Sequence, residues 1–520
     1  MLRITVSKNC TAAVNYFTQG LSQQDYYLDE QSISGRWYGK TAVMLGVSGA
    51  VEKEDFARIV NNRHPRTQQK LTVRDAINRR GGYDYTFSAP KSASILYGIT
   101  GDRDILRAHQ DAVQSAMAEV ERDMQTQITV RGKKEYLTTG NIAYAAFDHF
   151  TSRPVSVHKD QPLEADPQLH THCFVMNCTY RDDKQRFQAI EESNVHRNAI
   201  YYEALYHSHF SDRMKKAGYH IERTRKRWEV RRFDRSLIEK FSNRTLEIEQ
   251  QAKERRILSA KKKAALGART RKHKKRLRGV RDLQTTWESR LSQQENDIVH
   301  TAKNTRRSDD RKSSALTPDQ CIQRALDHYL ERKSAVAEKR VLAYALQLGY
   351  GTWTPQRIKT AFRERKDLVR AKKRTVDYVT TKVVLRAEDR IIDYARKTQG
   401  SVQPLHPEYR IQQDFMNRDQ KNAIKSILTS RDRITILSGV AGGGKSTLLR
   451  EVKTAIEQKN KQIFAFAPSA DASRKNLREK GFETADTIAR FLVDPQMQHA
   501  TKNQVIMIDE AGMVGVQTMN

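Results

Sequence analysis

The sequence predicts a chain of three successive parts: an α+β domain with a central antiparallel sheet, a basic helical middle region, and part of an α/β domain with parallel strands. Three observations predict this order. Residues 1–235 contain short runs that alternate apolar and polar residues, the region after 235 is rich in Lys and Arg, and residues 405–520 contain continuous apolar runs around a glycine-rich loop. The predicted boundaries are 1–235, 236–300, 301–400 and 401–520.

The balance of charge indicates a polyanionic partner. The chain has 93 Lys and Arg against 61 Asp and Glu, a formal net charge of +32 and a pI near 9.9. Such a charge favours a nucleic acid as the partner. Non-specific binding, as in ribosomal proteins, would also account for the charge. Four cysteines without a CxxC pair cannot hold a secreted disulfide scaffold together. No apolar run reaches the ~18 residues of a membrane helix. We therefore expect a cytoplasmic protein with no membrane insertion.

Residues 1–235 alternate predicted strands and helices. Aromatic and β-branched residues in alternating runs predict four strands, at Leu2–Val6, Asp84–Ala89, Ile142–Thr151 and His170–Tyr180. Amphipathic spacing predicts helices at Thr11–Gln24, Arg107–Met124 and Tyr202–Ala217.

The middle of the chain changes in character. Residues 253–281 hold fourteen Lys or Arg and one acid, Glu254, with no Pro, which predicts a helix. The stretch is either a clamp on nucleic acid, with Trp287 as a stacking face nearby, or simply a solvated helix or tail. Residues 301–315 are polar and suit a linker. Residues 316–400 are predicted to form a small helical module, which begins at Thr317 as N-cap and Pro318.

A phosphate-binding loop follows the apolar run Ile434–Leu437. The pattern G-x-x-x-x-G-K-[ST] is formed by Gly439, Gly444, Lys445 and Ser446, and Thr447 follows. Its backbone N–H groups and Lys445 suit the phosphates of ATP, and a Ser446 hydroxyl suits Mg²⁺. Two further apolar runs, Gln462–Phe466 and Gln504–Ile508, read as parallel strands. The second leads into Asp509 and Glu510, acids placed to hold the Mg²⁺ water shell and to orient a water. These features predict a RecA-like P-loop domain.

Two histidines share one face of a predicted strand. His170 and His172 lie two residues apart, and strand side chains alternate with period two. His149, near the end of an earlier strand, completes a set of three if the two strands are antiparallel neighbours. Three neutral imidazoles suit a divalent metal, with open positions for phosphate oxygens. Packing in the sheet is the alternative.

Three tyrosines near the N-terminus, Tyr16, Tyr26 and Tyr27, are candidate nucleophiles. A phenol can attack phosphorus where a metal polarises the phosphate. For any one of them, an aromatic core or a stacking role explains the residue equally well.

Together these residues resemble the TraI/TrwC-type conjugative relaxases, which are HUH endonucleases fused to a RecD-like superfamily-one helicase. The resemblance rests on the tyrosines and on the motifs Asp84–Ser92, Phe147–Arg153, Asp166–His172 and the P-loop. It implies that Tyr16 attacks the scissile phosphate, that Tyr26 or Tyr27 acts in the second strand transfer, and that the three histidines bind a divalent metal, Mg²⁺ or Mn²⁺. It also implies that Asp84 orients an imidazole or accepts the phenolic proton, and that Gln420, in the run 417–420, contacts adenine.

The sequence departs from that family in three places. Phe17 stands where the family commonly has a second tyrosine. The segment between His149 and His170 is about ten residues longer than the usual pattern and contains His158, which we expect to lie in a loop. The chain also stops ten residues after Glu510, so we expect a C-terminally truncated ATPase module.

The resemblance implies a bacterial site- and strand-specific DNA endonuclease and transesterase that nicks a plasmid origin of transfer during conjugation. Its implied partners are single-stranded origin-of-transfer DNA, relaxosome accessory proteins and a type IV secretion coupling protein. Two alternatives remain open: a DNA-dependent ATPase or helicase fragment, and an inactive DNA-binding remnant.

Overall fold

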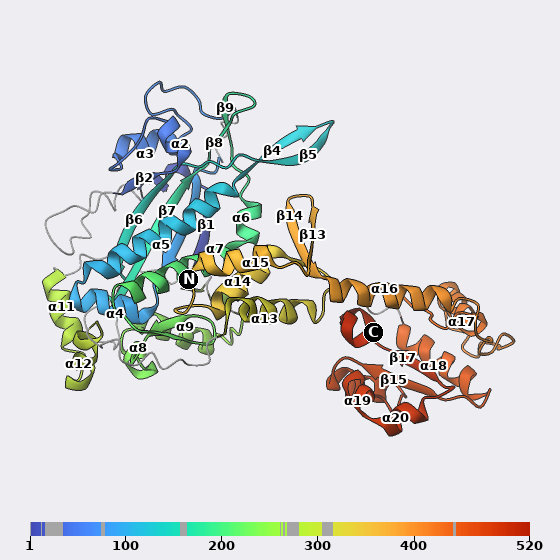
Figure 1. Cartoon of the computed structure of the whole chain (residues 1–520). Coiled ribbons are helices and arrows are strands. Elements are labelled where there is room, and N and C mark those ends of the chain that lie inside the picture. Colours follow the sequence, from blue (N-terminus) through green and yellow to red (C-terminus); the bar gives the residue numbers. More distant parts are fainter. Residues whose placement is uncertain are drawn as a thin grey trace. The chain divides into compact units, whose positions relative to one another are not determined.

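The computed structural model describes residues 2–11, 13–15, 35–73, 79–155, 164–259, 262–263, 266–267, 280–303, 316–439 and 444–520. The chain divides into two compact units (Figure 1). The first comprises residues 1–325, 337–365 and 372–377, and the second comprises residues 326–336, 366–371 and 378–520. Across the described residues, no helix is both long and apolar enough to cross a membrane.

A five-stranded antiparallel sheet forms the centre of the first unit and confirms the predicted α+β class. Its strand order is β1-β3-β7-β6-β2, so the two longest strands, β6 and β7, lie next to each other inside the sheet. The strands are β1 Leu2–Ser7, β2 Arg36–Tyr38, β3 Gly82–Ser88, β6 Tyr144–Thr151 and β7 Pro167–Met176.

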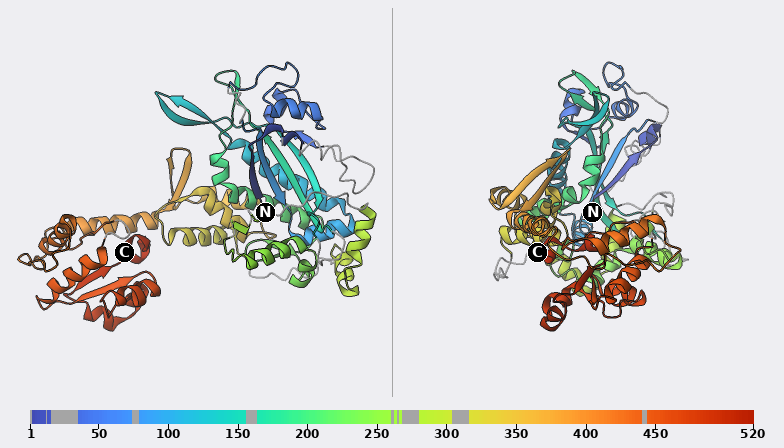
Figure 2. Two further views of the ribbon diagram at one scale, coloured as in Figure 1. Left: turned by 180° about the vertical axis from the view of Figure 1, so that it is seen from behind. Right: turned by 90° about the vertical axis from the view of Figure 1, so that its right-hand side faces the viewer.

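Helices cover one face of this sheet. Figures 1 and 2 show α5 (Arg103–Arg122) and α7 (Ala199–Lys216) side by side over the strands. α4 (Lys91–Thr100) follows β3 directly and packs on β7. The sequence explains this cover, because α5 places Ile105, Ala108, Ala112 and Val113 at helical spacing and buries them all.

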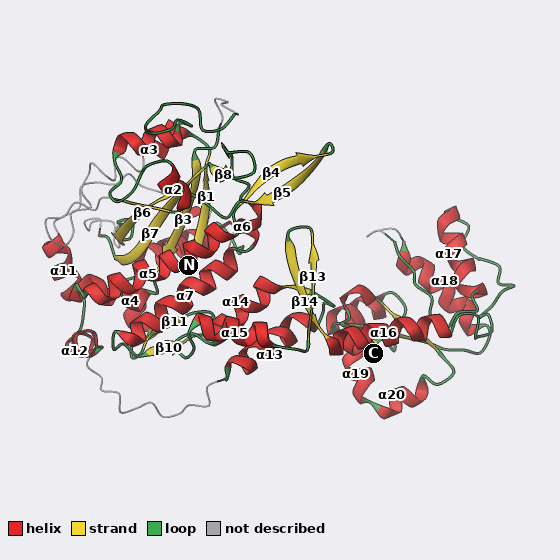
Figure 3. Ribbon diagram, turned by 45° about the horizontal axis from the view of Figure 1, so that its top comes forward, coloured by secondary structure: helices red, strands yellow, loops and turns green. Residues whose placement is uncertain are grey.

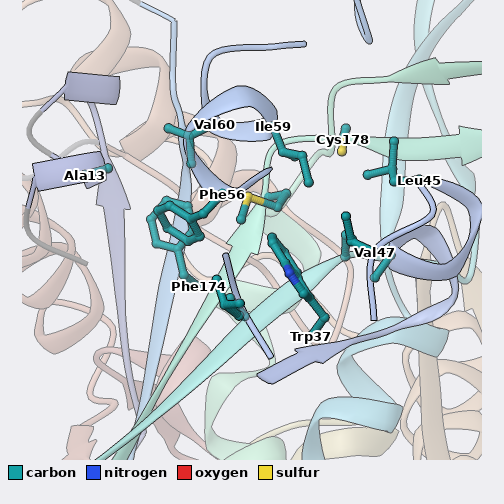
Figure 4. Close-up of a cluster of buried hydrophobic side chains, with 14 of the residues drawn as sticks. Ala13, Trp37, Leu45, Val47, Phe56, Ile59, Val60, Phe174 and Cys178 are labelled. Carbon is teal, nitrogen blue, oxygen red and sulfur yellow. The ribbon is translucent and has the colours of Figure 1, made fainter. Parts of the chain in front are cut away.

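The other face carries a second hydrophobic cluster at one end of the sheet (Figure 4). Trp37 of β2, Phe147 of β6 and Phe174 of β7 pack there against Phe56 of α3 (Lys53–Val60). The ring centres of Phe56 and Phe174 lie 5.3 Å apart. Since Phe147 and His149 are two residues apart on one strand, this core and the histidines share a face of the sheet.

The remaining elements of the first unit surround this sheet. The β4–β5 hairpin projects from it as a two-stranded ribbon (Figure 3). The elements are α2 Lys40–Met44, β4 Gln125–Val130, β5 Lys133–Thr138, β8 Thr179–Arg181, β9 Arg186–Gln188, α6 Ser193–Arg197, β10 Ile221–Arg223, β11 Trp228–Val230, α8 Arg235–Lys240, α9 Asn243–Glu254, α11 Val280–Glu288 and α12 Gln293–Thr301.

The basic stretch 253–281 lies largely outside the described residues. Where it is described, residues 253–254, 262–263, 266–267 and 280–281 are helical, as predicted, but α9 ends at Glu254 and residues 255–259 interrupt the helix. The cap residues of α9 show why: the Ala252 carbonyl accepts the N–H of Ile257, and Arg256 adopts a positive φ of 50°. This is a helix-ending turn.

Residues 316–400 are a mixed module, so the prediction of a purely helical one is wrong. The predicted start is confirmed, because Thr317 Oγ1 accepts from the N–H of Gln320 at 3.2 Å and α13 begins at Pro318. A hairpin then follows three helices, because the β-branched and aromatic residues of 376–381 favour a strand. The elements are α13 Pro318–Leu330, β12 Val336–Ala337, α14 Glu338–Leu348, α15 Pro355–Glu364, β13 Leu368–Lys373, β14 Val376–Thr381 and α16 Lys382–Lys397.

The second unit contains a parallel sheet in the order β16-β15-β17, which confirms the α/β prediction. The predicted strand at Ile434–Leu437 does not form: Ile436 is 87% exposed and the run pairs with no described strand. An apolar run needs a neighbouring strand for its N–H and C=O groups. The elements are α17 Arg418–Thr429, α18 Lys445–Glu457, β15 Ile463–Ala467, the π-helix Asp471–Leu477, β16 Asp486–Thr487, α19 Ile488–Val493, α20 Pro495–Ala500, β17 Val505–Ile508, the 3-10 helix Ala511–Met513 and α21 Val516–Met519.

Candidate active site

The structure brings the three predicted histidines together. His149 of β6 lies directly opposite His170 of β7 in the antiparallel register, and His172 lies two residues further along the same face. The ring centres are 5.3 Å apart for His149 and His170, 5.1 Å for His149 and His172, and 5.2 Å for His170 and His172. The condition under which His149 completes the set, that the two strands are antiparallel neighbours, is therefore met.

Two of these imidazoles have a fixed tautomer. The carboxylate of Asp84 lies 2.8 and 3.0 Å from Nδ1 of His172, and the Gln168 carbonyl lies 2.8 Å from Nδ1 of His170. A carboxylate and a carbonyl only accept, so each Nδ1 carries a proton, and in the neutral form of such a ring Nε2 is the nitrogen that can bind a metal. Thr86, opposite His172 in the sheet, places its hydroxyl 3.2 Å from the same Nδ1.

The electrostatics of the cluster keep an imidazole neutral. Burial, together with the neighbouring His172 and His149, lowers the pKa of His170 well below its ordinary value. A neutral imidazole is the form that binds a metal, and an ion about 2 Å from a nitrogen of each ring would fit ring centres roughly 5 Å apart. The donor set therefore suits a divalent metal.

The rings are not yet converged on one point. Within the described parts of the chain, no group of three or more His, Cys, Asp or Glu side chains is arranged to hold a metal ion. The His149 and His170 rings are stacked, with their planes only 23° apart. A shared ion would require one ring to turn.

A buried hydrogen-bond chain lies behind the histidines, on the opposite face of the sheet. Thr171, between His170 and His172, donates to Asp148 Oδ1 at 2.5 Å, and Nε2 of His109 lies 2.8 Å from the Thr171 oxygen. Tyr206 of α7 lies 2.8 Å from Nδ1 of His109, and Gln110 donates to Asp148 Oδ2 at 2.7 Å. The chain therefore ties α5 and α7 to the two strands that carry the imidazoles.

A second buried carboxylate fastens helices of the middle region to β7. Asp166, 1% exposed and four residues before His170, accepts from both N–H donors of Asn243 at 2.9 and 3.0 Å and from both terminal nitrogens of Arg290 at 3.1 Å. The indole of Trp287 donates to the carbonyl of Ala165 at 2.8 Å. Trp287 is therefore a buried packing residue, and the predicted stacking face is wrong.

Lys91 of the Asp84–Ser92 motif holds the same strand. Its ammonium donates to the Pro167 carbonyl at 2.8 Å, and burial lowers its pKa to about 8 despite the favourable charge of Asp166. Four side chains thus fix the residues that precede His170 on β7. They are Lys91 of α4, Asn243 of α9, Trp287 of α11 and Arg290 of the loop after α11.

The phosphate-binding loop is described at its two ends. Gly444 adopts a positive φ of 75° at the N-cap of α18, which Lys445 begins and Ser446 and Thr447 continue. The ammonium of Lys445 donates to the Gly439 carbonyl at 2.6 Å and so spans the loop. A Cβ at Gly444 would lie 2.4 Å from Nε2 of Gln420, so the predicted adenine-contacting side chain reaches this loop.

The two acids follow β17 as predicted. The N–H of Asp509 donates to the carbonyl of Phe466 at 2.9 Å, which continues the pairing of β17 with β15. Glu510 adopts a positive φ of 53°, and its N–H donates to Asp509 Oδ1 at 3.0 Å. Both acids thus lie at the carboxyl edge of the parallel sheet, where such domains bind ligands.

Some predicted residues lie outside the described part of the chain. These are Tyr16, Tyr26, Tyr27 and His158. The sequence interpretation also missed residues that the structure brings to the site. His109 was detectable, since a histidine on the apolar stripe of α5 needs buried partners. Asp148 and Thr171 were also detectable, because each directly neighbours a histidine on its strand and so must point to the opposite face of the sheet. Asp166 and Arg290 are far apart in the sequence, and no sequence pattern connects them.

Comparison with known proteins gives two family matches and several relatives. The model of the TrwC relaxase family matches residues 10–294, and an AAA domain model matches residues 415–520. Multifunctional conjugation protein TraI of Escherichia coli is 34% identical over 283 residues, and that of strain K12 is 32% identical over 282 residues. Each match covers 52% of this chain and 15% of the relative. A copper-bound structure of conjugative relaxase TrwC in complex with oriT DNA matches 56% of this chain and 97% of its own, with 27% identity and a TM-score of 0.50.

Proposed function

Because the chain belongs to the TrwC relaxase family, we propose that it nicks single-stranded DNA at an origin of transfer and holds the cut strand through a covalent 5′-phosphotyrosyl bond. The observation that carries the proposal is the set of three imidazoles on β6 and β7, two of them with Nδ1 held by a carboxylate or a carbonyl. The similar copper-bound TrwC relaxase is in complex with oriT DNA, which supports the same substrate for this chain.

In the proposed reaction the phenolic oxygen of Tyr16 attacks the scissile phosphorus. The bond from phosphorus to the 3′-oxygen breaks, the new bond joins phosphorus to tyrosine, and the 3′-oxygen takes up a proton while the phenol loses one. A divalent metal, Mg²⁺ or Mn²⁺, would supply charge stabilisation at the phosphate oxygens when held by His149, His170 and His172. Tyr26 or Tyr27 would make the second strand transfer.

Asp84 fits a positioning role better than that of a proton acceptor. Both of its oxygens lie within 3.0 Å of Nδ1 of His172, which holds the ring with Nε2 directed away from the carboxylate. We propose that Asp84 raises the basicity of this imidazole and fixes its plane. Of the two roles implied by the sequence, orientation is therefore the one with geometric support.

The second unit is proposed to bind ATP with Mg²⁺. Lys445 and Gly444 would contact the phosphates, Ser446 and Asp509 the metal, Glu510 a water and Gln420 the adenine. Relaxosome accessory proteins and a type IV secretion coupling protein are proposed partners by family membership. We also propose a cytoplasmic location, on the basis of family membership.

The test is nicking of an origin oligonucleotide by the full chain, with and without EDTA. A covalent adduct that EDTA prevents, and that Tyr16→Phe abolishes while DNA binding stays within a few fold, supports the proposal. His158→Ala is the control for His149→Ala, and only the latter should lose Mn²⁺ binding by calorimetry. An adduct that persists in Tyr16→Phe would transfer the initiating role to Tyr26 or Tyr27.

Two other outcomes would overturn the proposal. DNA-stimulated ATP hydrolysis without any adduct would identify an ATPase fragment. Salt-sensitive DNA binding with neither reaction would identify a DNA-binding remnant.

A further inference from the structure

Residues 318–381 have the element order of a winged helix. In chain order they form a helix (α13), a short strand (β12), two helices (α14 and α15) and a hairpin (β13 and β14). The short strand lies beside the second strand of the hairpin, giving the sheet order β12-β14-β13. Two helices joined by a turn are the helix-turn-helix unit, and the hairpin after them is the wing. α15 therefore holds the position of the helix that enters a DNA groove.

The exposed side of α15 is basic and polar. The helix turns Pro355, Ile358 and Phe362 inward, and all three are buried. The opposite side carries Gln356, Arg357, Arg363 and one acid, Glu364, all exposed. Because the three buried positions occupy one stripe, the exposed residues form a continuous outer face.

The tip of the hairpin is basic as well. Lys372, Lys373 and Arg374 are exposed at the turn, and Arg374 adopts a positive φ of 57° that closes it. From residue 355 to residue 377 the chain carries nine Lys or Arg against three acids. This charge is complementary to a phosphate backbone.

Within the first unit, α15 and the turn before it are fastened to α5 and α7. The N–H of Gly351, between α14 and α15, donates to the Ser211 hydroxyl of α7 at 3.1 Å. Lys359, on the flank of α15, pairs with Glu119 of α5 at 2.6 Å. These contacts use the flank of α15 and leave its outer face exposed.

A polar cleft of about 280 Å³ separates the tip of the hairpin from the β4–β5 ribbon within the first unit. Its lining includes Tyr136 and Thr138 of the ribbon, Lys372 and Arg374 of the hairpin, and the acids Asp123, Glu338 and Asp377. The cations of the tip thus border open space and are not packed into a protein core.

We propose that α15 and the tip of the hairpin, which both lie in the first unit, bind double-stranded DNA in the manner of a winged helix, with the outer face of α15 in a groove and Lys372, Lys373 and Arg374 on the phosphates. A helix about 10–12 Å wide fits a major groove about 12 Å wide. The site is separate from the histidine cluster. It gives the chain a duplex-binding surface in addition to the single-strand site of its proposed reaction.

The test compares two triple variants of the full chain by fluorescence anisotropy. The wing variant is Lys372→Gln, Lys373→Gln, Arg374→Gln. The matched control removes three exposed cations of α16, as Arg386→Gln, Arg390→Gln, Arg396→Gln. The probes are a duplex of arbitrary sequence, about 20 base pairs or two helical turns, and one of its strands alone, each titrated over a salt series.

We expect the wing variant to lose roughly tenfold or more in duplex affinity. The slope of log affinity against log salt should also fall by up to about 0.9 for each phosphate contact removed. The control variant should stay within twofold of the parent, and both should bind the single strand like the parent. Far-UV circular dichroism and thermal melting establish that both variants are folded.

Three results would overturn the proposal: equal losses of duplex affinity in the two variants, an unchanged slope in the wing variant, or a loss confined to the single strand. Retained duplex binding together with lost binding of poly-glutamate would assign the surface to an acidic protein partner. Because the probes lack an origin sequence, none of these outcomes depends on whether the chain nicks DNA.

Discussion

Thr171 shows how a residue without a direct chemical role can hold the histidine cluster in place. Its hydroxyl lies between Asp148 and His109, and all three side chains are wholly or partly buried. Thr171→Val keeps the shape of the side chain but leaves both partners without this hydrogen bond. We expect a loss of about 1–3 kcal/mol in the free energy of unfolding, measured with urea. Metal affinity should fall as well, because the strand pairing of β6 and β7 is loosened.

The exposed Thr129 of β4 is the matched control. Thr129→Val removes a hydroxyl that faces solvent, so its effect on unfolding should stay within about 0.5 kcal/mol. Equal losses in the two variants would contradict the structural role of the chain behind the histidines.

Glu192 gives the first unit a pH dependence of stability. Burial, with the nearby Glu191, raises the pKa of Glu192 from 4.5 to about 7. Between these two values the folded chain binds more protons than the unfolded chain, so the contribution of this residue to stability falls as pH rises from about 4.5 to 7. The side chain of Glu192→Gln cannot ionise. The free energy of unfolding of this variant should therefore equal that of the parent near pH 4 and exceed it by about 1–3 kcal/mol above pH 7.

The measurement is the melting temperature of the parent and of Glu192→Gln from pH 4 to pH 8. Glu135→Gln, at an exposed position of β5, is the control and should follow the parent at every pH. A constant difference between parent and Glu192→Gln across this range would show that the pKa of Glu192 does not change on folding, and would contradict this prediction.

At the scale of single residues, the period-two alternation of strand side chains was enough to predict the histidine cluster from the sequence. His170 and His172 were placed on one face by their spacing, and His149 joined them once the strands were taken as neighbours. The partners of Thr171 could not be predicted in the same way. His109 comes from a helix 62 residues earlier, and only the packing of α5 on the sheet brings it to the hydroxyl.

At the scale of elements, Asp166 is the attachment point of the middle-region helices. Its buried carboxylate is the acceptor for Arg290, whose side chain is 20% exposed, and for Asn243 at the start of α9. Asp166→Ala leaves the guanidinium without its main counter-charge in a largely buried place. We therefore expect a loss of about 3–5 kcal/mol in stability and faster hydrogen exchange in α11 and α12.

Glu54→Ala serves as the control for this prediction. Glu54 also pairs with an arginine, Arg58, but its side chain is 79% exposed, so its removal should cost less than about 1 kcal/mol. Unchanged exchange in α11 after Asp166→Ala would show that Trp287 and the apolar contacts hold these helices without the carboxylate.

The elements that sequence predicted well are those whose signal is local. β1, β15 and β17 appeared within a residue or two of the predicted runs, since each run also found a neighbouring strand. The run Ile434–Leu437 has an equally apolar composition, yet it pairs with no described strand: Ile434 and Ile436 are exposed, and Leu437 packs against the core of the second unit. The hairpin at 368–381 was missed because its first strand, rich in Lys and Arg, lacks the alternation of a half-buried strand.

At the scale of the whole molecule, the described residues of the two units form separate hydrophobic clusters. The aromatic cluster around Phe56 and Phe174 belongs to the first unit, and the cluster around Ile424, Val452 and Ala465 belongs to the second. Composition and length predicted several domains. They could not predict that residues 316–381 would be divided between the two units, because this division depends on contacts of α14 with α7 that are far apart in sequence.

Separate cores predict separate unfolding transitions in calorimetry. A ligand that binds one unit stabilises that unit alone, in proportion to the logarithm of its concentration over its dissociation constant. ATP with Mg²⁺ should therefore raise the second-unit transition only, and Lys445→Ala should abolish this shift because the side chain that spans the loop to Gly439 is lost. Asp166→Ala should lower the temperature of the first-unit transition only, which assigns the two peaks.

Nucleotide binding should also protect residues 434–439 from hydrogen exchange, since the run leads into the phosphate loop. A single transition that both ATP and Asp166→Ala displace would show that the two cores unfold as one cooperative body. In that case Lys445→Ala should also alter nicking, whereas independent units predict that it leaves nicking unchanged.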